Sequence, residues 1–191
     1  MTAQSTQLPI RMISRVVHGF GRGSKDLGIP TANVSLDKDT LKCSIDDYDA
    51  LPTGIYWGFA RIGEPSVDLS QGKGDAGGQS VLGRVYTTAI SIGYNPTYNN
   101  KEKTVEPHLI AEPDHPQRHA SSTGETQFQD FYGKTIVLSV VGFIRNELPF
   151  EGLDKLTEAI KKDINDAVNL ANGSEPFIIA ERTWVKTASD V

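Results

Sequence analysis

Short runs of β-branched and aromatic residues punctuate the chain, and five of them are long enough to form strands. These runs cover residues 10–17, 54–62, 85–92, 104–110 and 135–144. The last run is apolar on both strand faces, one formed by Ile136, Leu138, Val140 and Ile144 and the other by Val137, Val141 and Phe143. Because both faces have side chains to bury, this strand is predicted to lie near a packed centre.

A helical pattern follows the last strand. Its apolar positions share one helix face and are Leu153, Leu156, Ile160, Ile164, Ala167 and Val168. The pair Asn172-Gly173 is typical of a helix C-terminus. Strands first and one helix last, without regular β-α alternation, predict a mainly antiparallel barrel or sandwich. A closed barrel is favoured because closure removes exposed strand edges.

Two polar stretches, at residues 63–83 and 111–127, interrupt this order and are predicted to be surface insertions. The length of 191 residues fits one domain with decorations. We therefore expect a flexible N-terminus over residues 1–9, a single domain over 10–172 and a C-terminal tail over 173–191.

The net charge of −5 gives no broad electrostatic reason to bind nucleic acid or an anionic membrane. The single cysteine, Cys43, cannot form an intramolecular disulfide, which is compatible with a reducing compartment. The first residues lack the pattern of a secretory signal, and the longest apolar stretch, residues 136–144, is too short to span a bilayer. Composition thus predicts a cytoplasmic protein and leaves organellar association open.

A glycine-rich segment follows the first predicted strand. Gly19, Gly21 and Gly23 alternate, which would let successive backbone N–H groups face phosphate oxygens, while Arg22 and Lys25 supply positive charge. The same alternation occurs in ordinary tight turns. The segment is neither a Walker A loop nor a dinucleotide-binding Gly-x-Gly-x-x-Gly loop, so familiar nucleotide folds are not implied.

A hydroxyl and a carboxamide, from Thr31 and Asn33, come shortly after these glycines. In an extended segment, side chains two residues apart point the same way. Neutral oxygen donors of this kind suit Mg²⁺, which keeps several waters and takes further ligands from nucleotide phosphates. Alternatively, the two side chains only cap a turn.

The stretch from Gly19 to Asn33 resembles the N-terminal signature of the eukaryotic-type monofunctional riboflavin kinases. The resemblance extends over residues 10–171 through further matching segments: Gly54-Ile55-Tyr56, Ser91-Ile92-Gly93-Tyr94-Asn95-Pro96, Val105-Glu106-Pro107-His108, Asp130-Phe131-Tyr132-Gly133, Gly142-Phe143-Ile144-Arg145 and Gly152-Leu153-Asp154-Lys155-Leu156. It implies a six-stranded antiparallel Greek-key barrel with a C-terminal helix alongside.

The resemblance also implies an activity: phosphorylation of the riboflavin 5′-hydroxyl to give FMN and ADP. ATP would be the co-substrate and Mg²⁺ the cofactor, with Zn²⁺ or Mn²⁺ as alternatives. The expected metal ligands are Thr31 and Asn33. The expected ATP-binding residues are Gly19, Gly21, Gly23, Lys25, Thr31, Asn33, Leu109 and Tyr132.

Glu106 matches the family's catalytic glutamate. A carboxylate with an ordinary pKa of about 4.3 cannot fully deprotonate an alcohol, but it can accept the proton as the oxygen–phosphorus bond forms. We therefore expect a general base. His108 lies on the same face of its predicted strand and is the second candidate.

Arg145, Leu148 and Phe150 match the family's flavin-contacting positions, where an apolar or aromatic wall suits a flat ring system. The chain departs from the family at Asn146, where proline is usual, and at Thr97, where an aromatic residue often stands. Without the proline, the loop is less constrained.

Two other functions compete with a monomeric kinase that binds riboflavin, FMN, ATP and ADP but no nucleic acid. One is a non-catalytic flavin or nucleotide-binding barrel, against which the set of Thr31, Asn33 and Glu106 argues. The other is a barrel that binds single-stranded nucleic acid, which the acidic charge and the lack of a basic stripe disfavour.

Overall fold

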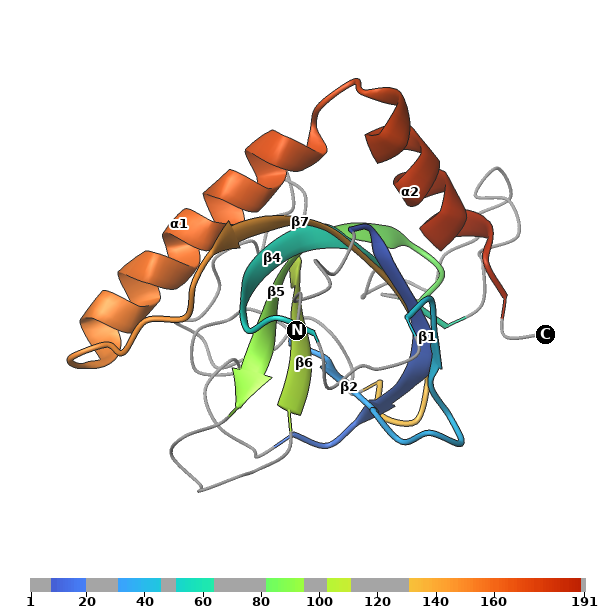
Figure 1. Cartoon of the computed structure of the whole chain (residues 1–191), viewed down its shortest axis with the longest axis horizontal. Coiled ribbons are helices and arrows are strands. Elements are labelled where there is room, and N and C mark those ends of the chain that lie inside the picture. Colours follow the sequence, from blue (N-terminus) through green and yellow to red (C-terminus); the bar gives the residue numbers. More distant parts are fainter. Residues whose placement is uncertain are drawn as a thin grey trace, which may run out of the picture.

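A computed structural model describes residues 8–19, 31–45, 51–63, 82–94, 103–110 and 131–189 (Figure 1). Its strands and helices are β1 (Ile10–Val17), β2 (Asn33–Val34), β3 (Lys42–Cys43), β4 (Gly54–Ile62), β5 (Val85–Tyr94), β6 (Lys103–Ile110), β7 (Thr135–Arg145), α1 (Leu153–Ala171) and α2 (Pro176–Thr187). The five long strands and the first helix lie where the sequence pattern predicts them. Most of the two predicted insertions, over 64–81 and 111–127, lies outside the described residues.

The strands form one antiparallel sheet in the order β2-β1-β7-β4-β5-β6, and β3 pairs with β1 off this path. The sheet curls until its ends meet, because Thr31 and His108 form a bridge and the Ala32 N–H donates to the Pro107 carbonyl at 3.0 Å. Figure 1 looks into the resulting barrel. Placing β7 between β1 and β4 is the non-sequential order of a Greek key, so the predicted fold class is confirmed.

Two cores hold the fold together. The inner core fills the barrel and includes Met12, Ile62, Ile90 and Leu138, each fully buried. The outer core lies between the barrel and the helices, and its members are Trp57, Phe59, Ala89, Ile110, Val137, Val141, Ala167, Ala171, Ile178 and Val185. Strand β7 contributes to both cores, which explains its two apolar faces and confirms its predicted central position.

The predicted assignment of faces is wrong near the end of β7. Register shifts in the β4–β7 pairing leave Val141 and Ile144 without direct partners on β4. Each extra residue of a bulge reverses the alternation of the side chains that follow. The Phe143 ring consequently meets the Tyr56 ring of the inner core edge-on at 5.3 Å, whereas Ile144 packs against the outer core.

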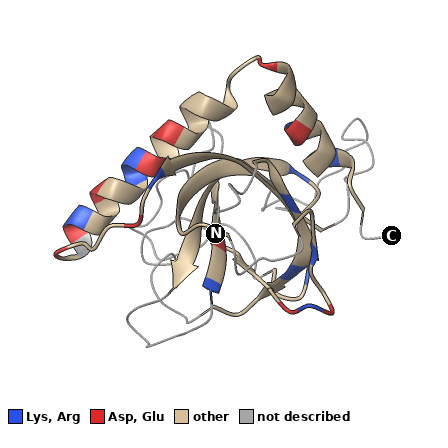
Figure 2. Cartoon of the chain, in the orientation of Figure 1, with Lys and Arg blue, Asp and Glu red and all other residues tan. Residues whose placement is uncertain are grey.

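Helix α1 begins after Gly152, whose φ of 98° favours glycine. Acidic and basic residues are interspersed along α1 (Figure 2). Lys155 pairs with Glu151, which precedes the helix, and Lys162 pairs with Asp166. Among the described residues, no helix has the length and apolar character needed to cross a membrane.

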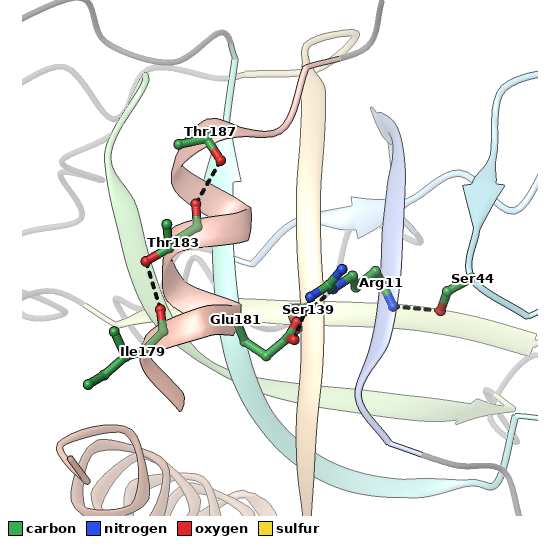
Figure 3. A network of polar contacts seen from close by, with 7 residues as sticks. All are labelled: Arg11, Ser44, Ser139, Ile179, Glu181, Thr183 and Thr187. Atoms are coloured by element: carbon green, nitrogen blue, oxygen red, sulfur yellow. Dashed lines mark hydrogen bonds and ion pairs between the residues drawn. The ribbon is translucent and has the colours of Figure 1, made fainter. Parts of the chain in front are cut away.

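The sequence pattern predicts a tail after residue 172, but the structure has a second helix, α2. Pro176 stands in its first turn, where proline's missing N–H costs nothing. Arg11 of β1 donates to Glu181 of α2 through Nε (2.9 Å) and Nη2 (2.7 Å), and Ser139 Oγ of β7 donates to the same carboxylate at 2.8 Å (Figure 3). The guanidinium of Arg61 donates to carbonyls at the end of α2, including that of Val185 at 2.8 Å. Helix α2 is therefore fixed to three strands by polar contacts.

Candidate functional site

A cavity of about 260 Å³ lies on the outer face of β5 and β6, beneath α1. Its apolar lining comes from β4, β5, the segment between β7 and α1, and α1 itself: Ile55, Ala89, Leu148, Phe150, Leu156 and Ile160. Its polar lining is Ser91, Glu106, His108, Arg145, Glu147 and Asp163. An apolar wall facing a few convergent polar groups is typical of a site for a small molecule.

Strand β6 delivers the two acid–base candidates to this cavity. Val105 and Leu109 point into the inner core, so the alternating positions Glu106 and His108 face outward to the cavity. Glu106 lies directly across from Ser91 of β5. The predicted common face for Glu106 and His108 is therefore confirmed.

Burial tunes both groups. It raises the pKa of Glu106, against the opposing effect of a hydrogen bond from Thr104. Burial lowers the pKa of His108 to about 4, with the negative charge of Asp163 acting in the other direction. Glu106 is consequently a stronger base than an ordinary carboxylate, while His108 is neutral near pH 7.

A second carboxylate, that of Glu147, lines the cavity beside Glu106. Burial and the charge of Glu106 raise the pKa of Glu147, and these effects outweigh a hydrogen bond from Ser91 and the charge of Arg145, which act in the opposite direction. Gly93 leaves room for it, because a Cβ there would lie 2.1 Å from Glu147 Oε1. Sequence reasoning did not assign Glu147 to the site, although it is the acidic residue two positions after Arg145.

Arg145, a predicted flavin contact, is held by α1. Its Nε and Nη2 donate to the two Asp163 oxygens at 2.7 and 2.6 Å, and its Nη1 donates to the Asn146 carbonyl at 2.9 Å. The guanidinium also lies over the Phe150 ring, 5.6 Å from its centre. Asp163 was missed by sequence reasoning; the available signal was an acidic residue, only 4% exposed here, within the apolar stripe of α1.

Leu148 and Phe150, the other predicted flavin contacts, both line the cavity. Leu148 is 56% exposed, so its side chain is accessible at the cavity mouth. The structure thus brings the three predicted flavin positions together around one cavity. Their contact with a flavin stays a prediction.

The predicted metal ligands lie next to β6. Ala32 and Val34 enter the inner core, so Thr31 and Asn33 point to the opposite side of the strand, as predicted. Thr31 Oγ1 is 3.0 Å from His108 Nδ1. The Asn33 carboxamide lies against Gly19, where a Cβ would approach Asn33 Nδ2 to 2.4 Å.

These donors fit a hard divalent cation. A hydroxyl and a carboxamide oxygen supply neutral ligands and leave most positions to water and phosphate, which matches the preference of Mg²⁺. Among the described residues, no group of three or more His, Cys, Asp or Glu side chains forms an alternative metal site.

The remaining predicted nucleotide contacts divide into three groups. Tyr132 is 39% exposed and stacks on His18 at 3.6 Å, next to Gly19 in the sequence; sequence reasoning did not single out His18. Leu109 is 1% exposed and its side chain belongs to the inner core, not to the cavity. Gly21, Gly23 and Lys25 lie outside the described residues.

Comparison with known proteins addresses the identity of this fold and site. A family model described as flavokinase, or riboflavin kinase, matches residues 6–171. The riboflavin kinase of Aspergillus fumigatus is 36% identical over 161 residues, which cover 81% of this chain and 72% of that protein. The riboflavin kinase of Homo sapiens is 35% identical over 161 residues, covering 84% and 79%.

A solved structure agrees with the fold. The crystal structure of riboflavin kinase from Trypanosoma brucei has a TM-score of 0.58 and 23% identity, covering 98% of this chain and 92% of that one. At this identity the likeness bears on the fold alone. The family match over most of the chain, together with the identities to two riboflavin kinases, establishes the assignment. The chain belongs to the riboflavin kinase family.

Proposed function

We propose that the chain transfers the terminal phosphoryl group of ATP to the 5′-hydroxyl of riboflavin, giving FMN and ADP, with Glu106 as general base. The observation that carries the site assignment is the geometry of β6. Glu106 and His108 lie two residues apart on the outer face of β6. Glu106 lines the cavity, and His108 contacts Thr31. The base candidate and the metal candidate therefore serve one site.

The ribityl hydroxyl is a poor nucleophile while it keeps its proton. Glu106 accepts that proton as the new oxygen–phosphorus bond forms, and its raised pKa makes it a better acceptor than an exposed carboxylate. We rank His108 below it as the base, because His108 Nδ1 already has Thr31 Oγ1 at hydrogen-bond distance.

The nucleotide end is assigned to Gly19, Gly21, Gly23 and Lys25 at the phosphates, and to Tyr132 near the rest of ATP. Leu109, whose side chain lies in the inner core, would take part only through its backbone. Thr31 and Asn33 would hold the divalent cation, and Mg²⁺ is proposed over Zn²⁺ or Mn²⁺ because both donors are neutral oxygens. When bound, the cation neutralises charge on the phosphates, which lowers the barrier to phosphoryl transfer.

The flavin end is assigned to Arg145, Leu148 and Phe150. The ring system of riboflavin suits the apolar wall, and the ribityl hydroxyls need polar partners. Glu147 and Ser91 line the cavity next to Glu106 and are placed to supply them. The ribityl chain would then run past Glu147 toward Glu106.

The proposed functional unit is residues 10–172, acting as a cytoplasmic monomer on free riboflavin without a nucleic-acid partner. Size-exclusion chromatography with light scattering tests the monomer: a mass near that of one chain is expected. A mass of two chains would contradict it.

One assay tests the reaction. Purified protein is incubated with riboflavin, ATP and Mg²⁺, and FMN and ADP are measured by chromatography. We expect equal amounts of both products, and none after chelation of the metal. Flavin binding without product would instead support a non-catalytic flavin carrier.

A further inference from the structure

The contact between Thr31 and His108 points to a role for His108 that acid–base chemistry does not cover. The two residues form the backbone bridge that joins the segment before β2 to β6, and their side chains meet at 3.0 Å between Oγ1 and Nδ1. Thr31 is a proposed metal ligand, and His108 also lines the cavity that contains Glu106.

The backbone fixes the position of Thr31 but leaves its hydroxyl a choice. The bridge to His108 and the hydrogen bond from Ala32 N–H to the Pro107 carbonyl, 3.0 Å long, hold the Cα in place. A threonine side chain still has several staggered rotamers, and its O–H rotates. A partner for Oγ1 on the neighbouring strand selects one of these arrangements.

His108 suits that task because it is itself held firmly. It lies between Pro107 and Leu109, both buried, on a strand paired with β5 over its whole length. A hydroxyl whose oxygen lone pair faces a cation points its O–H away from that cation and donates a hydrogen bond there, and an imidazole nitrogen without a proton accepts such a bond. With the Nε2–H tautomer, Nδ1 of His108 is such an acceptor.

We infer that His108 is a positioning residue that accepts a hydrogen bond from the Thr31 hydroxyl and so directs Thr31 Oγ1 toward the divalent cation bound with the nucleotide. The inference rests on the proposed role of Thr31 as a metal ligand. It adds that β6 serves both halves of the reaction, through Glu106 at the acceptor hydroxyl and through His108 at the metal.

Calorimetric titration with ADP, once with Mg²⁺ and once with EDTA, isolates this role without any turnover. The quantity of interest is the factor by which Mg²⁺ tightens ADP binding. We expect His108→Leu to reduce this factor about tenfold, as for the loss of one hydrogen bond to a charge-bearing site. Binding in EDTA should stay within about twofold of the wild type.

Three further variants separate positioning from a structural effect. His108→Asn keeps an acceptor at the place of Nδ1, so it should restore most of the factor. Val105→Ala weakens the same strand from the inner core and should lower stability while leaving the factor unchanged. In a Thr31→Val background, which lacks the hydroxyl, His108→Leu should have no further effect.

Other results would overturn the inference. A normal Mg²⁺ factor in His108→Leu, an uncorrected defect in His108→Asn, or a further loss in the Thr31→Val background would each do so. A normal factor in Thr31→Val alone would remove the metal role of Thr31, and the inference with it. Failure of wild-type protein to make FMN, with the expected pattern of ADP binding, would sink the proposed function and leave the role of His108 standing.

Discussion

Two arginine–carboxylate pairs attach the two helices to the barrel, and they differ in what surrounds them. Arg145 of β7 binds Asp163 of α1 through two hydrogen bonds, and Arg11 of β1 binds Glu181 of α2 in the same way. The first pair lines the cavity. The second is joined by Ser139 (Figure 3), and none of its three residues lines the cavity.

The comparison shows that one kind of contact serves two purposes. Both carboxylates are nearly buried, at 4% exposure, and both depend on the arginine to offset the cost of removing charge from water. At α2 the result is attachment of a helix. At α1 the same contact also orients a guanidinium beside the apolar wall where we place the flavin. The neighbourhood of a pair, not its geometry, sets its contribution to function.

The largest effect is expected inside the cavity, without any change to either pair. Glu106→Gln keeps the shape of the side chain but removes the base, so turnover should fall by about 10²–10⁴-fold. The unfolding midpoint should not fall, since burial already disfavours the charged form of Glu106. Steady-state kinetics and thermal unfolding measure the two quantities. The matched change Glu147→Gln should raise the KM for riboflavin more than it lowers kcat. Near-normal turnover in Glu106→Gln would remove the general-base assignment.

Breaking the pair at α1 should affect both stability and substrate binding. Asp163→Asn leaves the Arg145 guanidinium, whose side chain is 22% exposed, without its charged partner. We expect a loss of about 3 kcal/mol in unfolding free energy. The KM for riboflavin should rise about tenfold, equivalent to one lost polar contact. Denaturant unfolding and riboflavin titration provide the two measurements. An unchanged KM would mean that Arg145 needs no partner to meet the flavin.

Breaking the pair at α2 should affect stability alone. Arg11 has a side chain that is 39% exposed, so in Glu181→Gln it can hydrate, and the cost should be smaller, about 2 kcal/mol. Kinetic constants measured well below the unfolding midpoint should equal those of the wild type. A raised KM for riboflavin in this variant would show that the two helices do not act independently.

The smallest effect is a pH dependence of stability that has opposite signs for Glu181 at α2 and Glu106 in the cavity. Burial opposes ionisation of Glu181, but hydrogen bonds from Arg11 and Ser139 outweigh it and lower its pKa, so its stabilisation is lost as pH falls below about 4.3 through the folded-state value. Glu106 has a raised pKa, so stability falls as pH rises from about 4.3 through that higher value. A plot of unfolding midpoint against pH should differ in slope from that of the wild type below about pH 4.3 for Glu181→Gln and above about pH 4.3 for Glu106→Gln. Parallel curves for all three proteins would contradict both shifts.

Sequence patterns were sufficient where one local rule decided the outcome. The period of two in β6 put Glu106 and His108 on one face, and the apolar stripe of α1 located that helix because its face needed burial. The faces at the end of β7 were not predictable from sequence. Val141 and Ile144 are ordinary strand residues, and only the pairing with β4 shows that they are the bulge residues without partners.

Residues that depend on a distant partner also escaped prediction. Asp163 and Glu181 are buried acidic residues on helices, and each is paired with an arginine on a strand, 18 positions earlier for Arg145 and 170 positions earlier for Arg11. Glu147 belongs to the same class, since its role depends on the space left by Gly93. The resemblance to a family predicted residues for the two ends of the site but not the side chains that support them.

The period of two in β6 has a consequence for the specificity of strand register. A slip of one residue in the pairing of β6 with β5 would turn every side chain of β6 to the opposite face. Glu106 and His108 would then enter the inner core, while Val105 and Leu109 would be turned out into the cavity. A misregistered chain would therefore lose the proposed base from the cavity and, with two polar groups in its core and apolar groups exposed, would be less stable. The strand register that gives a stable core is therefore also the register that places Glu106 and His108 at the proposed site.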